Sequence, residues 1–139
     1  MKQYAVVIPV FAKTCFMMQR KSKHHIGMWE FPAGKSDPGE DTRDTAVREY
    51  FEETGAAVTH NDLQLLMTTY TSTLYSTLGH WKNDYYITKC KLIKSLTIAE
   101  PEIHSDAKWF NINDILQMRN AGVIVPTSST VIEVLSQNI

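Results

Sequence analysis

The sequence predicts one α/β domain, and three observations carry this prediction. Segments with the apolar runs of strands and segments with helical spacing follow one another along the chain, which indicates a mixed arrangement around one sheet. The 139 residues suffice for one domain of ordinary size. Apolar residues make up 43% and charged residues 21% of the chain, enough to build a core and to argue against disorder. We therefore expect residues 1–139 to form a single domain.

The N-terminal part of the chain has the pattern of two strands followed by irregular structure. Residues 4–11 form an apolar run typical of a buried strand, in which Pro9 indicates an edge position or a bulge. Residues 15–18 can pair with it as a second strand. Residues 20–27 are polar and basic, which favours a loop. The glycines and prolines of residues 29–39 predict turns and not the interior of an element.

The strongest helix prediction covers residues 41–54. Asp41 or Thr42 can cap its start, and Gly55 stands where a left-handed residue commonly ends a helix. Four apolar side chains recur at helical spacing and are expected to face the core. They are Ala46, Val47, Tyr50 and Phe51.

The remaining elements are shorter or less strongly patterned. Segments rich in Thr, Tyr, Leu and Ile predict strands, and two closing helices are separated by Gly122 and Pro126. The expected strands are residues 63–74, 85–93 and 108–110, and the expected helices are residues 113–120 and 128–137.

Charge and cysteine content exclude several classes of protein. Fourteen basic and fifteen acidic residues leave a net charge of −1, which argues against a broad cationic surface for nucleic acid or anionic lipid. Cys15 and Cys90 are far apart and form no CxxC motif, so we expect neither a zinc ribbon nor a disulfide framework. The longest apolar stretch is too short to span a bilayer. We expect a cytoplasmic protein without a membrane partner or a stable nucleic-acid partner.

The predicted helix 41–54 carries three glutamates on one side. Glu49, Glu52 and Glu53 lie at i, i+3 and i+4, within an arc of roughly 100°. Such like charges repel one another unless a cation lies among them, and carboxylate oxygens suit Mg²⁺ or Mn²⁺. Arg48 cannot balance all three. A solvated helix face is the alternative, but the preceding loop, residues 34–39, can bring backbone carbonyls near a metal.

Residues 34–56 resemble the signature of the Nudix hydrolase family. The family pattern is G-x5-E-x7-R-E-U-x-E-E-x-G-U, where U is a bulky aliphatic residue, and all seven fixed positions match. Tyr50 and Ala56 replace the usual aliphatic residues, but both can pack. Residues 16–20 and 108–116 are similar to other strands and a helix of the family. The resemblance, to MutT-like members above all, implies an α/β/α sandwich around a mixed β-sheet.

The resemblance also implies hydrolysis of a nucleoside diphosphate linked to another moiety, X, with Mg²⁺ (or Mn²⁺) as cofactor and a nucleotide as partner. The protein is expected to be a monomer or a homodimer. Site residues follow by matching positions: Glu52 and Glu53 as metal ligands, Glu49 as ligand or general base, and Gly34 as the backbone that approaches the metal. Arg48 matches a residue that orients a carboxylate, and Glu40 either orients the helix ligands or supplies an outer ligand.

Family members often add a glutamate from a loop outside this motif. Glu100 and Glu102 are the candidates, and we expect Glu102 among the metal ligands. Whether Glu49 or one of these two acts as the base stays open. Glu30 has either a structural role or a place near the metal.

Residues of three kinds are candidates for substrate contact. Arg20 resembles a basic residue that contacts phosphate, Lys35 is a second cation near the loop, and Ser128 matches the position of a base-recognising asparagine in MutT-type enzymes. Aromatic residues can stack on a base, although strand aromatics are more often core. These are Tyr70, Tyr75, Trp81, Tyr85 and Tyr86. The histidines show no metal spacing and are expected at the surface or in loops; they are His24, His25, His60, His80 and His104.

Two sequence cues favour different substrates. Trp29-Glu-Phe-Pro resembles MutT-like (d)NTP pyrophosphohydrolases, which release a nucleoside monophosphate and pyrophosphate. Residues 32–41 are similar to ADP-ribose and nucleotide-sugar hydrolases. We favour the first. A non-catalytic nucleotide-binding sensor is a third hypothesis, which the three intact glutamates oppose. Cleavage of capped or triphosphorylated RNA is disfavoured by the near-neutral charge.

Overall fold

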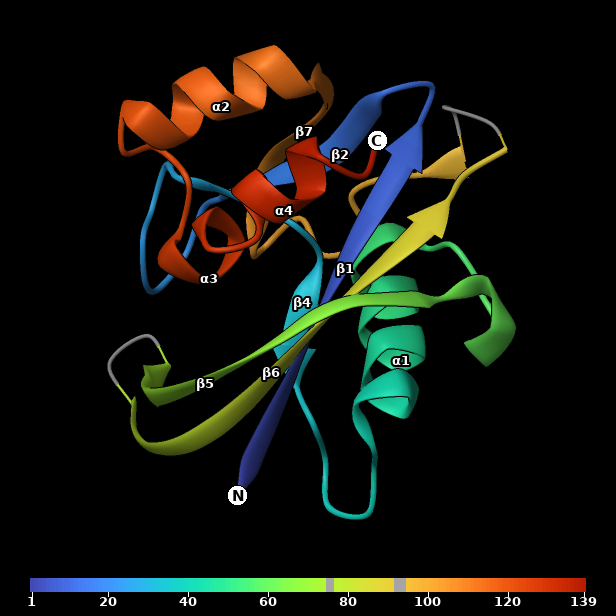
Figure 1. Ribbon diagram of the computed structural model, residues 1–139, viewed down its shortest axis with the longest axis vertical. Coiled ribbons are helices and arrows are strands. Elements are labelled where there is room, and N and C mark those ends of the chain that lie inside the picture. Colours follow the sequence, from blue (N-terminus) through green and yellow to red (C-terminus); the bar gives the residue numbers. More distant parts are fainter. Residues whose placement is uncertain (75–76, 92–94) are drawn as a thin grey trace.

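The computed structural model describes residues 1–74, 77–91 and 95–139, and its strands form one mixed sheet (Figure 1). The strand order is β3-β2-β1-β6-β5, with β4 paired to β1 and β7 paired to β2. β1 and β6 run parallel, whereas the other described pairs are antiparallel. The strands are β1 (Lys2–Phe11), β2 (Thr14–Arg20), β3 (Trp29–Glu30), β4 (Ala33–Lys35), β5 (Gln64–Leu74), β6 (Thr77–Lys89) and β7 (His104–Asn111).

Helices cover both faces of the sheet. The helical segments are α1 (Thr42–Thr54), η1 (His60–Asp62), α2 (Ile112–Asn120), α3 (Pro126–Ser129) and α4 (Ile132–Ser136). Because side chains of a strand alternate, Ala5 and Val7 of β1 pack with Tyr50 of α1, while Ile8 packs with Leu135 of α4. Figure 1 shows α1 on one side of β1 and α2, α3 and α4 on the other. The predicted α/β/α sandwich around a mixed sheet is confirmed.

The position of Pro9 differs from the prediction. β1 is an interior strand, not an edge strand, and Pro9 pairs with Thr88 of β6. On the opposite edge of β1, β4 pairs with residues 4–6 and β2 pairs with residues 10–11. Pro9 lies between these two partners, so its missing N–H leaves no ladder bond broken.

Several element boundaries also differ. β6 begins at residue 77 instead of 85, and residues 92 and 93 of that expected strand lie outside the described residues, as does Tyr75. β4 is a strand within the segment predicted as turns, because it pairs with β1. β7 is longer than expected since it pairs along β2. The expected closing helix is divided into α3 and α4.

α1 begins and ends as predicted. The Asp41 side chain accepts a hydrogen bond from the Asp44 N–H, and Gly55 adopts a left-handed conformation with φ of 75°. The predicted apolar face is wrong at Phe51, whose side chain is 56% exposed. Glu53 is buried instead, because the side of α1 that carries it packs against β4. None of the helices in the described ranges is long and apolar enough to cross a membrane.

Candidate active site

The free edge of β4 is covered by polar side chains of α1. Even-numbered residues of this segment bond to β1, so the backbone groups of Ala33 and Lys35 point away from it. The Ala33 N–H donates to Glu53 Oε1 at 2.8 Å, and the Lys35 carbonyl accepts from Arg48 Nη2 at 3.0 Å. Two residues of the predicted site therefore tie α1 to β4.

Gly34 is where backbone and carboxylate approach most closely. A Cβ atom at this position would lie 2.1 Å from Glu49 Cδ and 2.3 Å from Glu49 Oε1. Only glycine leaves room for the carboxylate where it stands. The close approach expected between Gly34 and a metal is, in the structure, a close approach between Gly34 and Glu49.

Arg48 lies among the acidic side chains. It donates to both oxygens of Glu40 at 2.8 and 2.9 Å, to Glu49 at 2.9 Å, and to Glu52 at 3.3 Å. The hydrogen bonds from Arg48 lower the pKa of Glu40 to about 2, so Glu40 is fully charged near neutral pH. Arg48 thus holds three carboxylates in fixed positions.

Buried negative charge is concentrated beside this network. Burial raises the pKa of Glu49 to about 7, against the lowering effect of Arg48, and the charges of Glu52 and Glu100 add to the rise. Burial, followed by the charges of Glu30 and Glu49, raises the pKa of Glu53 well above its ordinary value. A divalent cation would relieve this repulsion, and carboxylate oxygens are the ligands that Mg²⁺ and Mn²⁺ prefer.

The donor set therefore fits a divalent metal by chemistry and by charge. Within the ranges covered by the structure, no three acidic, histidine or cysteine side chains are already placed as a metal-binding group. Glu49 and Glu52 both accept from Arg48 Nη1, so they would have to turn toward an ion. Glu49, Glu52 and Glu53 are the side chains that would hold it.

Of the two loop glutamates, Glu100 is the one whose charge acts on this cluster. The charge of Glu100 raises the pKa of both Glu49 and Glu53. Glu102 is exposed and raises the pKa of Glu100. Glu100 thus acts on the cluster directly, while Glu102 acts on Glu100, and the assignment of Glu102 as a metal ligand stays a prediction.

Arg20 and His104 are placed differently from expectation, because both contact Glu30. Arg20 Nη1 lies 2.9 Å from Glu30 Oε2, and the same oxygen lies 2.8 Å from His104 Nε2. Glu30 and His104 are buried, and the Arg20 side chain is 12% exposed. The Arg20 guanidinium therefore does not face open solvent. It holds Glu30, whose charge acts on Glu53. The prediction of a surface position for His104 is wrong, because β7 begins at this residue and buries it.

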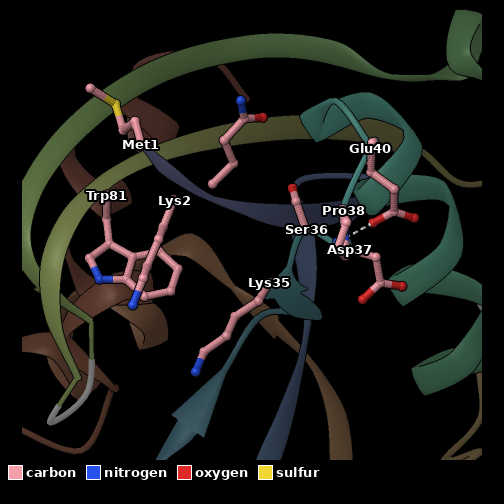
Figure 2. A pocket seen from close by; sticks show the side chains of 10 residues that line it. Met1, Lys2, Lys35, Ser36, Asp37, Pro38, Glu40 and Trp81 are labelled. Atoms are coloured by element: carbon pink, nitrogen blue, oxygen red, sulfur yellow. Dashed lines mark hydrogen bonds between the residues drawn. The ribbon is translucent and has the colours of Figure 1, made fainter.

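Lys35 and Ser128 lie on the other face of the sheet. Lys35 lines a cavity of about 510 Å³ with residues of the loop before α1, and its ammonium lies 5.5 Å from the centre of the Trp81 ring (Figure 2). Ser128 is 1% exposed, and its hydroxyl accepts a hydrogen bond from the Phe31 N–H at 3.0 Å. The expected contact of Ser128 with a base must be revised, since the side chain serves the backbone of Phe31.

We expect Ser128→Ala to lower the melting temperature by several degrees without changing nucleotide preference. The substitution leaves the buried Phe31 N–H without its acceptor, a loss of about 1–3 kcal/mol. Thermal denaturation of the variant measures this loss. The matched control is Ser136→Ala, which removes an exposed hydroxyl bonded to the Glu133 carbonyl. An altered base preference in Ser128→Ala would restore the original interpretation.

We also expect Mg²⁺ to stabilise the protein more at pH 8 than at pH 5.5. Glu49 and Glu53 have pKa values raised in the folded state, so their contribution to stability is complete near pH 4 and falls as the pH rises. For Glu49 it is lost as the pH rises through about 7. A bound cation removes this penalty. Glu40, with a lowered pKa of about 2, acts only below this window. Melting temperatures with and without Mg²⁺ at both pH values test the expectation; equal shifts would contradict it.

The chain is similar to known proteins in sequence and in fold. A family model described as NUDIX domain matches residues 1–127. The human protein named nucleoside diphosphate-linked moiety X motif 6 is 33% identical over 111 residues, which cover 78% of this chain and 32% of that protein. The mouse protein of the same name is 51% identical over 49 residues, covering 35% of this chain and 15% of that protein.

Solved structures share the fold over nearly the whole chain. MutT NUDIX hydrolase from Burkholderia pseudomallei has a TM-score of 0.79 at 22% identity, with 95% of each chain covered. The NUDIX domain of Shewanella oneidensis NrtR, solved in complex with ADP ribose, has a TM-score of 0.76 at 19% identity, with 98% of this chain and 86% of that chain covered. The chain spans about a third or less of the human and mouse relatives. On the match of the family model, this chain belongs to the Nudix family.

Proposed function

We propose that this protein hydrolyses a nucleoside diphosphate linked to another moiety, with Mg²⁺ or Mn²⁺ as cofactor. The single observation that carries the proposal is the convergence of two carboxylates, the partly buried Glu49 and the buried Glu53, on the backbone of residues 33–34. Carboxylates in this setting are expensive to ionise without a cation. Membership of the Nudix family supports the same reaction class.

Each residue has a role that its geometry supports. Glu52 and Glu53 would hold the metal, whose bound form neutralises a diphosphate and lowers the pKa of water. Glu49, with a pKa near 7 set mainly by burial, can accept the proton of the attacking water. Arg48 orients Glu40 and Glu49, and Glu100 is a second candidate for the base. Of the two candidates for the general base we favour Glu49, because its carboxylate lies against Gly34.

We favour a (d)NTP as substrate, cleaved to a nucleoside monophosphate and pyrophosphate. Lys35, in the segment that leads into α1, offers a cation for the phosphate chain, and the residues before Gly34 resemble MutT-like enzymes. An ADP-ribose or nucleotide-sugar pyrophosphatase is the second candidate. It is supported by the sequence of residues 32–41 and by the fold shared with a domain solved with ADP ribose. We further propose a cytoplasmic monomer or homodimer without a nucleic-acid partner.

A panel of nucleotides incubated with Mg²⁺ tests these alternatives. The panel contains the eight common NTPs and dNTPs, ADP-ribose, a nucleotide sugar and a 5′-triphosphorylated RNA, and the products are scored for pyrophosphate and monophosphate. Pyrophosphate from an NTP or dNTP is the expected result. Products from ADP-ribose alone would replace the first candidate by the second. Nucleotide binding without turnover of any compound would establish the non-catalytic sensor.

A further inference from the structure

A second cavity, of about 550 Å³, lies on the sheet face opposite α1. Its floor is formed by β5 and β6, and its wall by residues at the start of α3. Tyr85 lines the cavity, and its hydroxyl donates to the Thr127 carbonyl at 2.8 Å, which holds α3 beside the sheet. The cavity therefore combines an aromatic surface with a small number of polar groups, as is typical of small-molecule sites.

Asn83 contributes an unpaired acceptor to this cavity. Its side chain lines the cavity and is 1% exposed. The amide nitrogen donates to the hydroxyls of Thr69 at 3.3 Å and Thr71 at 3.1 Å, both of which also line the cavity. Asn83 Oδ1 accepts no hydrogen bond from any described part of the chain. A buried acceptor in this state costs about 1–3 kcal/mol, so a ligand that donates to it would recover that energy.

The cavity is within reach of the glutamate cluster. Tyr4 of β1 pairs with Asn83 on one side and with Lys35 of β4 on the other. Two strand spacings separate Asn83 from Lys35, which corresponds to about 10 Å. Lys35 directly follows Gly34, the residue that contacts Glu49. A nucleotide can span this distance, with its base over β5 and β6 and its phosphates at β4.

We propose that Asn83 recognises the nucleobase of the substrate by accepting a hydrogen bond from a ring N–H or an exocyclic amine. The inference rests on the proposed function and adds the residue that selects the base. Thr69 and Thr71 hold the Asn83 amide in its orientation, and Tyr85 supplies the apolar surface beside the base. Asn83 takes the role that the family resemblance implies for Ser128.

Binding of AMP, GMP, CMP and UMP, measured by calorimetry without added metal, tests this proposal. We expect at least one of them to bind the wild-type protein and Asn83→Leu to weaken that binding at least about tenfold, because leucine has similar volume and no acceptor. The matched control is Asn61→Leu, on η1, which is exposed and lies outside this cavity. Equal affinity of the wild-type protein and Asn83→Leu would overturn the proposal, as would wild-type protein that binds none of the four.

A change in the ligand separates recognition from a packing effect. The best-binding monophosphate is compared with an analogue that lacks its N–H donor: purine riboside monophosphate for AMP, or a ring N-methyl derivative for GMP or UMP. Loss of the donor should weaken binding to the wild-type protein and leave binding to Asn83→Leu unchanged. If Asn83→Leu does not fold, Asn83→Asp, which keeps an acceptor, replaces it and should retain discrimination between the two ligands. An equal loss in the wild-type protein and Asn83→Leu would overturn the inference, as would absence of discrimination in Asn83→Asp.

The two proposals fail separately. Turnover of nucleotides with an unchanged KM in Asn83→Leu would overturn the role of Asn83 and leave the hydrolase proposal intact. Absence of turnover in the wild-type protein, with binding that depends on Asn83, would overturn the hydrolase proposal alone.

Discussion

Glu53→Gln is expected to reduce turnover by on the order of 10³-fold while the protein stays folded. Glutamine keeps the oxygen that accepts from the Ala33 N–H, so the tie between α1 and β4 remains. It removes the negative charge that would bind a divalent ion, and this attraction is worth several kcal/mol in a buried site. Because burial raises the pKa of Glu53, the neutral side chain should also make the metal-free protein more stable at pH 8.

Turnover with the preferred nucleotide, metal affinity and melting temperature measure these effects. The matched control is Glu133→Gln, an exposed position on α4 that pairs with Arg119. Wild-type turnover in Glu53→Gln would exclude its role as a metal ligand. Loss of turnover together with a collapsed melting temperature would point to a purely structural role.

Gly34→Ala is expected to separate activity from stability. The added Cβ would lie within 2.5 Å of three Glu49 side-chain atoms, so the carboxylate must move. Glu49 is the flexible partner in this contact, which keeps the loss of stability small. Displacement of a reacting group by about 1 Å can reduce the rate about 10²-fold. We therefore expect a large fall in kcat and a small change in melting temperature.

Gly122→Ala is the matched control for Gly34→Ala and is expected to lower stability without lowering activity. Gly122 has φ of 72°, and no described atom lies within 4 Å of the place that a Cβ would occupy, so alanine there introduces backbone strain without a clash. We expect a lower melting temperature with wild-type kcat. Equal effects of the two substitutions on kcat would contradict the contact between Gly34 and Glu49 as the reason for glycine.

The part of the site that the sequence predicts is the part built from local interactions. The ends of α1 follow from Asp41 and Gly55, whose capping chemistry acts within one helical turn. The three glutamates of α1 share one side because of helix geometry alone. The layered fold followed from the family resemblance, and the match of the family model confirms that resemblance.

The remaining features depend on contacts between distant segments. Pro9 is acceptable in an interior strand only because two different strands meet beside it. Ser128 and Phe31 lie far apart in the sequence, and so do Glu30 and His104. No local pattern specifies such pairs. The unpaired acceptor of Asn83 likewise exists only once β5, β6 and α3 have come together. The burial of His104 could have been predicted only by extending the expected strand 108–110 back to residue 104, where β7 begins.

The parallel pairing of β1 with β6 also has a consequence for how the chain reaches its native state. On one edge of β1, residues 2–10 pair with residues 81–89, so this ladder cannot form before residue 89 has left the ribosome. Such long loop closure slows folding, and one edge of the apolar strand β1 stays unpaired meanwhile. Newly synthesised chains are therefore expected to depend on chaperones that shield this strand until its partner arrives.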